Sequence, residues 1–175
     1  MPNLYFLLRS ISVAIISVTV SIAQAQVLWN GTRYGMTTDR VIKIVKLAKT
    51  PDSPNVWGDG ARELLRIEEI KIVNNNFYAS FFFLKGRLTQ VTLSIENAGS
   101  FEDAIRVFNS LTEVLRVKYG AEIMRNVKRG TLNTADAEWM SGRTNINVSA
   151  LSVGDNLASL NVNYQVRIAT EADKL

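Results

Sequence analysis

The feature that most constrains the fold of this chain is a strict alternation of apolar and polar residues within Phe77–Glu96. In the second half of this stretch, Val91, Leu93 and Ile95 alternate with polar side chains. A period of two with one apolar face is typical of a strand in a sheet that is buried on one side only. Aromatic residues precede a turn at 85–87, so the whole stretch predicts a β-hairpin.

Further strands are expected on both sides of this hairpin. The segment 64–73 is predicted as a strand with a bulge near Glu68-Glu69, although its Glu, Leu and Arg content makes a helix the competing interpretation. Three strands are predicted over 135–140, 144–153 and 157–168. The last two carry Asn, Ser and Gln on their outer face, which suits either a wet interface or plain solvent.

Two amphipathic helices are predicted. The first begins at Thr37 or Thr38 and runs to about Lys49, with apolar residues at i, i+3, i+4 and i+7. The second runs from Ser100 to Tyr119 and begins with a capping-box pattern. Charges are interspersed along the chain, and the basic residues of the first helix are typical of a solvated face, with contact to anionic lipid or polysaccharide as the alternative.

These elements predict an α+β fold, with an antiparallel β-sheet and helices packed on one face. Each helix is followed by three predicted strands, so we expect two similar helix-βββ halves, about 26–97 and 98–169. Together they form a single domain over 26–175, in which 170–175 is a frayed tail.

The first 25 residues are predicted to be a secretory signal peptide. Arg9 precedes the apolar run Ile11–Ile22, and Ala23-Gln24-Ala25 provides an A-x-A cleavage site. An uncleaved membrane anchor is the alternative, but the apolar run is short for a span of about 20 residues. We therefore expect a periplasmic or secreted protein that does not span a membrane after cleavage.

Composition excludes several kinds of chemistry. The chain has no cysteine and no histidine, which removes Ser-His-Asp and Cys-His catalysis and thiolate or imidazole zinc sites. No phosphate-binding loop is present, and neither a cofactor nor a metal is expected. Without the signal peptide, 19 basic residues face 16 acidic ones in no cluster, so nucleic acid is not an expected partner.

One pair of carboxylates could support catalysis. Asp136 and Glu138 are two positions apart, so in a strand they lie on the same face. Paired carboxylates can carry out general acid/base chemistry, although a solvated sheet face explains the pattern equally simply. We therefore do not expect an enzyme, and keep a carboxylate enzyme of the cell envelope as an alternative.

Aromatic residues outside the predicted core mark candidate contact surfaces. Trp57 and Trp139 are placed in loops or near strand ends, while Tyr78 and Phe82 lie on the face opposite the other aromatics of their strand. Large exposed aromatics often mark binding surfaces, so these four residues are predicted to bind a partner. The alternative is that Tyr78 and Phe82 pack under the loop that carries Trp57.

A short motif provides a resemblance. The opening Trp29-x-Gly31-x-x-Tyr34-Gly35-Met36-Thr37-x-Asp39-x-Val41, together with Lys118-Tyr119-Gly120, resembles small exported bacterial proteins of unknown function. It is also similar to the β-lactamase-inhibitor-like group, which includes the small lipoprotein of the outer-membrane assembly machine. This resemblance implies tandem helix-plus-sheet halves, and no functional residue is carried over from it.

The function expected from the sequence is a non-catalytic periplasmic or secreted module that binds an unknown envelope protein or a small ligand. It would use the open face of the sheet and the aromatics at its rim. A carrier of a small apolar ligand, with a cavity between sheet and helices, is a further alternative.

Overall fold

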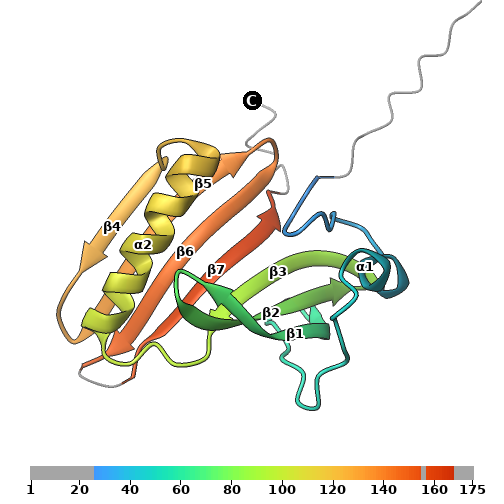
Figure 1. Cartoon of the computed structure of the whole chain (residues 1–175), viewed down its shortest axis with the longest axis horizontal. Helices are drawn as coiled ribbons and strands as arrows, with labels where there is room; N and C mark the ends of the chain where they lie inside the picture. The colour runs from blue at the N-terminus through green and yellow to red at the C-terminus, as the bar shows by residue number, and fades with distance from the viewer. Residues whose placement is uncertain (1–25, 155–156, 168–175) are drawn as a thin grey trace, which may run out of the picture.

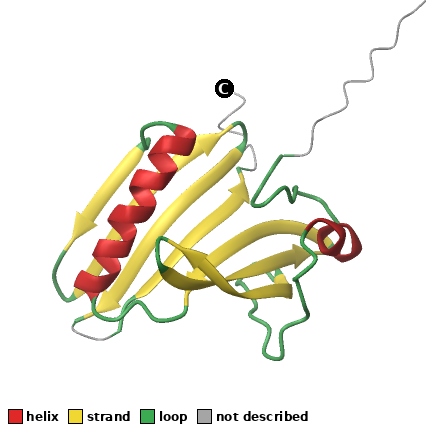
Figure 2. Cartoon of the chain, viewed as in Figure 1, coloured by secondary structure: helices red, strands yellow, loops and turns green. Residues whose placement is uncertain are grey.

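A computed structural model describes residues 26–154 and 157–167, and contains two helices and seven strands (Figures 1 and 2). The predicted signal peptide and frayed tail lie outside these residues. Among the described residues, no helix has both the length and the apolar character that a membrane crossing needs. In chain order the elements are α1 (Thr38–Ile44), β1 (Arg62–Ile72), β2 (Asn75–Leu84), β3 (Arg87–Ile95), α2 (Phe101–Tyr119), β4 (Met124–Lys128), β5 (Leu132–Ser141), β6 (Thr144–Val153) and β7 (Ser159–Val166).

All seven strands belong to one sheet in the order β1-β2-β3-β7-β6-β5-β4, and every neighbouring pair is antiparallel. The expected α+β fold with an antiparallel sheet is therefore confirmed. The last strand, β7, lies in the middle, where it joins the β1–β3 meander to the β4–β6 meander. The strand direction turns between these two parts of the sheet (Figure 1), as expected from right-handed twist.

One face of the sheet is buried and the other is largely polar. The apolar positions of β3, β6 and β7 form a single hydrophobic cluster with residues from both helices. In β3 the predicted residues Val91, Leu93 and Ile95 are all buried, while Gln90 and Ser94 on the opposite face are partly covered; Thr92 on that face is also buried, at 5% exposure. The alternation therefore separates a core face from an opposite polar face, as predicted.

Helix α2 follows the prediction closely and lies on β5, β6 and β7 (Figure 2). Its first turn is fixed by a capping box: Ser100 Oγ accepts a hydrogen bond from the Asp103 backbone N–H, and the Asp103 carboxylate accepts one from the Ser100 backbone N–H. Phe108 and Ala104 on its inner face are fully buried, whereas Val117 on its outer face is exposed to solvent.

Helix α1 is shorter than predicted, because it ends at Ile44 instead of Lys49. Lys49 leaves the helix and pairs with β1, where the backbone N–H of Lys49 donates to Arg66 O at 2.8 Å and that of Arg66 donates to Lys49 O at 2.7 Å. The predicted apolar stripe is buried at Val41, Val45 and Ala48, whereas its fourth member, Ile44, is 43% exposed. Pairing with a neighbouring strand thus replaces the last helical turn.

The strand interpretation of 64–73 and its bulge are both confirmed. The β1–β2 register shifts between Ile67 and Ile70, and Glu69 has a φ of 59°. Helix α2 is followed by four strands rather than three, because β4 pairs with β5 in a segment that had no clear alternation. The prediction of three strands in each half therefore fails in the second half.

Phe108 provides a test of how α2 is anchored. Its side chain is 0% exposed, so Phe108→Ala leaves a cavity between α2 and the sheet, and we expect it to lower the free energy of unfolding by about 3–5 kcal/mol. Val117→Ala is the matched control on the same helix, at a position that is 91% exposed. It should change stability by less than about 0.5 kcal/mol. Urea denaturation measures both, and equal losses would contradict this packing of α2.

Candidate functional site

The polar face of the sheet is hollowed where it meets the loop between α1 and β1. The cavity has a volume of about 490 Å³, and we call it the amide groove because amide side chains predominate in its lining. Its lining residues are Trp57, Gly58, Asp59, Gln90, Glu138, Asn145, Asn147, Asn163 and Gln165.

The strand register explains why these side chains converge. Gln90 of β3 is opposite Gln165 of β7, which is opposite Asn145 of β6. One pleat further along, Thr92, Asn163, Asn147 and Glu138 form a second row across β3, β7, β6 and β5. Because alternate residues of a strand point to the same face, both rows lie on the side of the sheet opposite α2.

A hydrogen-bond network orders part of the groove floor. Gln90 Nε2 donates to Thr92 Oγ1 at 2.8 Å, and Thr92 Oγ1 donates to Asn163 Oδ1 at 2.9 Å. Asn145 Oδ1 is different, since it is buried and accepts no hydrogen bond from the described residues. A buried acceptor without a donor is costly, so this atom favours the arrival of a donor from water or a ligand.

Trp57 forms one wall of the groove. Its ring packs against Phe82 with a centroid separation of 5.5 Å and an interplanar angle of 59°. The residue remains 47% exposed, while Phe82 beneath it is only 3% exposed. The turn that carries Trp57 is closed by two backbone hydrogen bonds, from Trp57 N to Ala61 O and from Gly60 N to Trp57 O, each at 2.9 Å.

A buried carboxylate ties this loop to the sheet. The side chain of Glu63 is 0% exposed and is paired with Arg66, whose Nε donates to Oε1 at 2.6 Å. Ser80 Oγ donates to the same oxygen at 2.6 Å, and the Asn55 backbone N–H and side-chain amide donate to Oε2 at 3.0 and 2.9 Å. Glu63 therefore connects β1, β2 and the Trp57 loop.

These contacts set the protonation of Glu63. Burial by itself raises the pKa of this carboxyl, but the hydrogen bonds from Arg66, Ser80 and Asn55 outweigh burial and hold the pKa below its ordinary value of 4.5. The carboxylate thus remains charged and partnered in the folded state.

Two of the four predicted binding residues lie at this site. Trp57 lines the groove and is exposed, as predicted. Phe82 was expected to be exposed, but it is buried under Trp57, so the alternative of packing beneath the loop applies to it. Tyr78 is half-buried and lies under the Arg66 guanidinium, 5.1 Å from the ring centroid.

Trp139 was expected to be exposed near a strand end, and that expectation is wrong. It is 1% exposed, and its Nε1 donates to Gly120 O at 3.0 Å. The reason is strand parity: Ala135, Ala137 and Trp139 alternate with the polar residues of β5 and point to the core, where α2 ends. Trp139 is part of the core and cannot contact a partner in this conformation.

The predicted carboxylate pair lies on the polar face, but only one member reaches the groove. Glu138 lines it, whereas Asp136 lies one row away, opposite Ser149 and Asn126. Burial raises the pKa of Asp136, while the positive charge of Lys128 opposes that shift. Among the described residues there is no cluster of three or more potential metal ligands.

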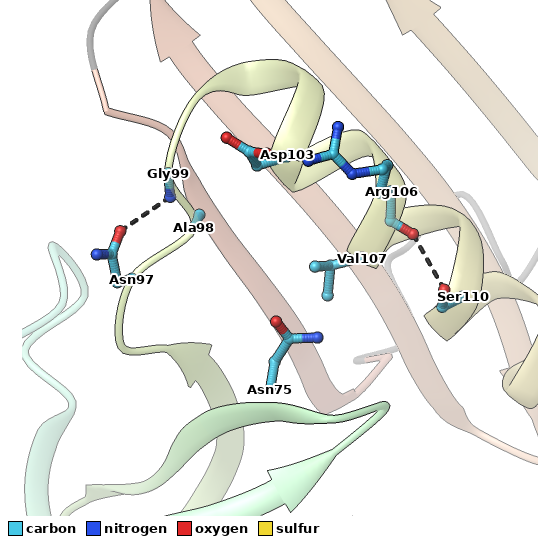
Figure 3. Close-up of a pocket in the computed structure, with 8 residues that line it drawn as sticks. All are labelled: Asn75, Asn97, Ala98, Gly99, Asp103, Arg106, Val107 and Ser110. Carbon is cyan, nitrogen blue, oxygen red and sulfur yellow. Dashed lines mark hydrogen bonds and ion pairs between the residues drawn. The ribbon is translucent and has the colours of Figure 1, made fainter.

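Two other cavities are weaker candidates for a binding site than the amide groove. One of about 440 Å³ lies between the β1–β2 turn and the first turns of α2, and Figure 3 shows its lining residues. Its polar groups are engaged locally, as Asn97 Oδ1 accepts from Gly99 N and Ser110 Oγ donates to Arg106 O. Another, of about 560 Å³, is mostly apolar and lies between the end of α1, β1 and Lys118.

The amide groove was not recognised from the sequence, although its signal was present. The alternating Asn and Gln residues of β6 and β7 were assigned to an interface or to solvent. The pattern does not indicate that β7 lies beside β3. Nor does it indicate that the Trp57 loop lies next to the paired part of these two strands.

Glu63→Gln tests the loop attachment. We expect it to lower the free energy of unfolding by roughly 1.5–3 kcal/mol, because hydrogen bonds to a charged group are lost in a buried site. Glu68→Gln is the control, since that side chain is 58% exposed and 3.5 Å from Arg66. Thermal unfolding measures both, and an equal effect of the two substitutions would contradict a special role for Glu63.

The lowered pKa of Glu63 predicts that the free energy of unfolding decreases at acid pH. Because the folded-state pKa of Glu63 is below 4.5, its contribution is fully present above that pH and is lost as the pH falls through the lower folded value. Stability measured by urea denaturation from neutral to acid pH should therefore fall less steeply for Glu63→Gln than for the parent protein. Parallel profiles would contradict this assignment.

Comparison with known proteins provides no relative: no protein-family model, no curated protein and no solved structure matches this chain.

Proposed function

We propose that this protein is a non-catalytic binding module and that the amide groove is its binding site. The observation that carries the proposal is the convergence of five amide side chains in one cavity beside a half-exposed tryptophan. A concave site that combines an aromatic surface with several polar groups is the usual form of a ligand pocket.

Preorganisation supports the proposal. The floor of the groove lies on four adjacent strands of the sheet, β3, β7, β6 and β5, and its wall is attached to the same sheet through Glu63. Ligand binding to such a site requires little ordering of the protein, so most of the contact energy remains available for affinity. The side chain of Asn145 lines the groove, and its buried Oδ1 accepts no hydrogen bond from the described residues.

The cellular setting is also a proposal. The N-terminal A-x-A pattern, together with the resemblance to small exported bacterial proteins, favours a periplasmic or secreted module built from two related helix-plus-sheet halves. The absence of Cys and His from the sequence fits a non-catalytic role. The apolar-carrier alternative would use the cavity near the end of α1 instead.

Nuclear magnetic resonance with probes of several classes tests this proposal. The probes are cellotetraose, tetra-alanine, tetragalacturonate and the apolar dye anilinonaphthalene sulfonate, each titrated into ¹⁵N-labelled protein. We expect at least one hydrophilic probe to shift the Trp57 indole and the Asn145 and Asn147 side-chain amide signals. In Asn147→Ala, the affinity for that probe should fall about tenfold.

Asn109→Ala is the matched control, because Asn109 lies on α2, which packs on the opposite face of the sheet. It should leave the affinity unchanged. If none of the hydrophilic probes shifts the groove signals, the proposal fails. If the dye alone binds, at residues near Ile44 and Ile70, the carrier alternative replaces it.

A further inference from the structure

We infer that the ligand of the amide groove is a neutral carbohydrate, and specifically an oligosaccharide. This inference rests on the proposed binding function and adds the chemical class of the ligand. Three properties of the groove carry it: its hydrogen-bonding groups, its exposed indole and its lack of cationic side chains.

The hydrogen-bonding groups match those of sugars. A carboxamide offers two N–H donors and one oxygen acceptor, and a sugar hydroxyl both donates and accepts. Asn145 Oδ1 requires a donor. Asn163 uses its oxygen to accept from Thr92, and its N–H₂ group has no partner among the described residues. Groups that donate and groups that accept are thus both available, in two adjacent rows of the groove floor.

Trp57 provides the apolar part of the site. Sugar rings present C–H groups on their faces, and an indole ring offers a flat surface against which such a face can pack. Phe82 supports the indole at an angle of 59°, so it does not cover a face of the ring by parallel stacking. Trp57 therefore remains 47% exposed, beside the amide side chains that line the groove.

Charge, hydrogen bonding and the position of the groove on the sheet argue against the other ligand classes. Neither Lys nor Arg lines the groove, while Asp59 and Glu138 do, so a phosphate or carboxylate ligand would meet repulsion without a compensating partner. An apolar ligand would bury the amides without hydrogen bonds, which is costly. Extended peptides commonly add to a sheet edge, whereas this groove lies on the face of the sheet, and no residue of either edge strand, β1 or β4, lines it.

The polar surface continues beyond the groove, which favours an oligomer. A third row follows the first two and contains Ser94, Asn161, Ser149 and Asp136, on β3, β7, β6 and β5. Neighbouring strands are about 4.8 Å apart, so the rows present hydroxyl and amide groups at regular short intervals. Successive units of a sugar chain can therefore contact the same surface.

Isothermal titration calorimetry of the purified protein provides the test, with cellotetraose, chitotetraose and mannotetraose as neutral probes. We expect at least one to bind, with an affinity that changes less than about twofold between about 50 mM and about 500 mM salt, because a neutral ligand releases few counterions. Trp57→Ala should weaken binding about tenfold, while Trp57→Phe should retain most of it.

Controls separate this inference from the proposed function. Tetra-alanine and tetragalacturonate serve as the peptide and anionic probes, and Asn109→Ala as the control variant. If tetra-alanine shifts the groove signals and no neutral sugar binds, the carbohydrate inference is overturned while the binding function stands. Preferential, salt-sensitive binding of tetragalacturonate also overturns it. If no probe binds at the groove, both fail.

Discussion

The pairing of β3 with β7 is the interaction on which the rest of the structure depends. It joins Gln90–Ser94 to Asn161–Gln165 and turns two meanders into one seven-stranded sheet. The same pairing brings the amides of β7 beside β3 and near the Trp57 loop. The core face and the amide groove therefore both depend on the pairing of β3 with β7. Thr92 and Asn163, hydrogen-bonded at its centre, are 71 positions apart in the chain.

Local patterns were sufficient to predict most elements. The capping box at Ser100, the alternation of β3 and the parity change at Glu69 each lie within a few residues, and each was confirmed. Propensity and periodicity act over this range, which explains why α2 and the hairpins could be predicted. The length of α1 could not, because Lys49 leaves the helix to pair with β1, far along the chain.

The candidate site was harder to predict because its residues meet through non-local contacts. The sequence predicts Trp57 as an exposed aromatic, but it indicates the burial of Phe82 under the Trp57 loop only as an alternative, since the pattern of β2 does not show whether a loop covers its outer face. Trp139 was misplaced because its end of β5 lies under the C-terminal end of α2. The sequence pattern does not indicate the role of Glu63, whose buried carboxylate accepts the two Asn55 hydrogen bonds that hold the loop beside the groove.

The central place of β7 also has a consequence for the order of folding. It is the last of the described strands along the chain, yet it pairs with β3 on one side and β6 on the other. The N-terminal meander and the β4–β6 meander can each form from local hairpins, but neither can join the other until β7 inserts between them. Long-range pairing of this kind slows folding. The continuous sheet therefore closes only after Ser159–Val166 has been synthesised.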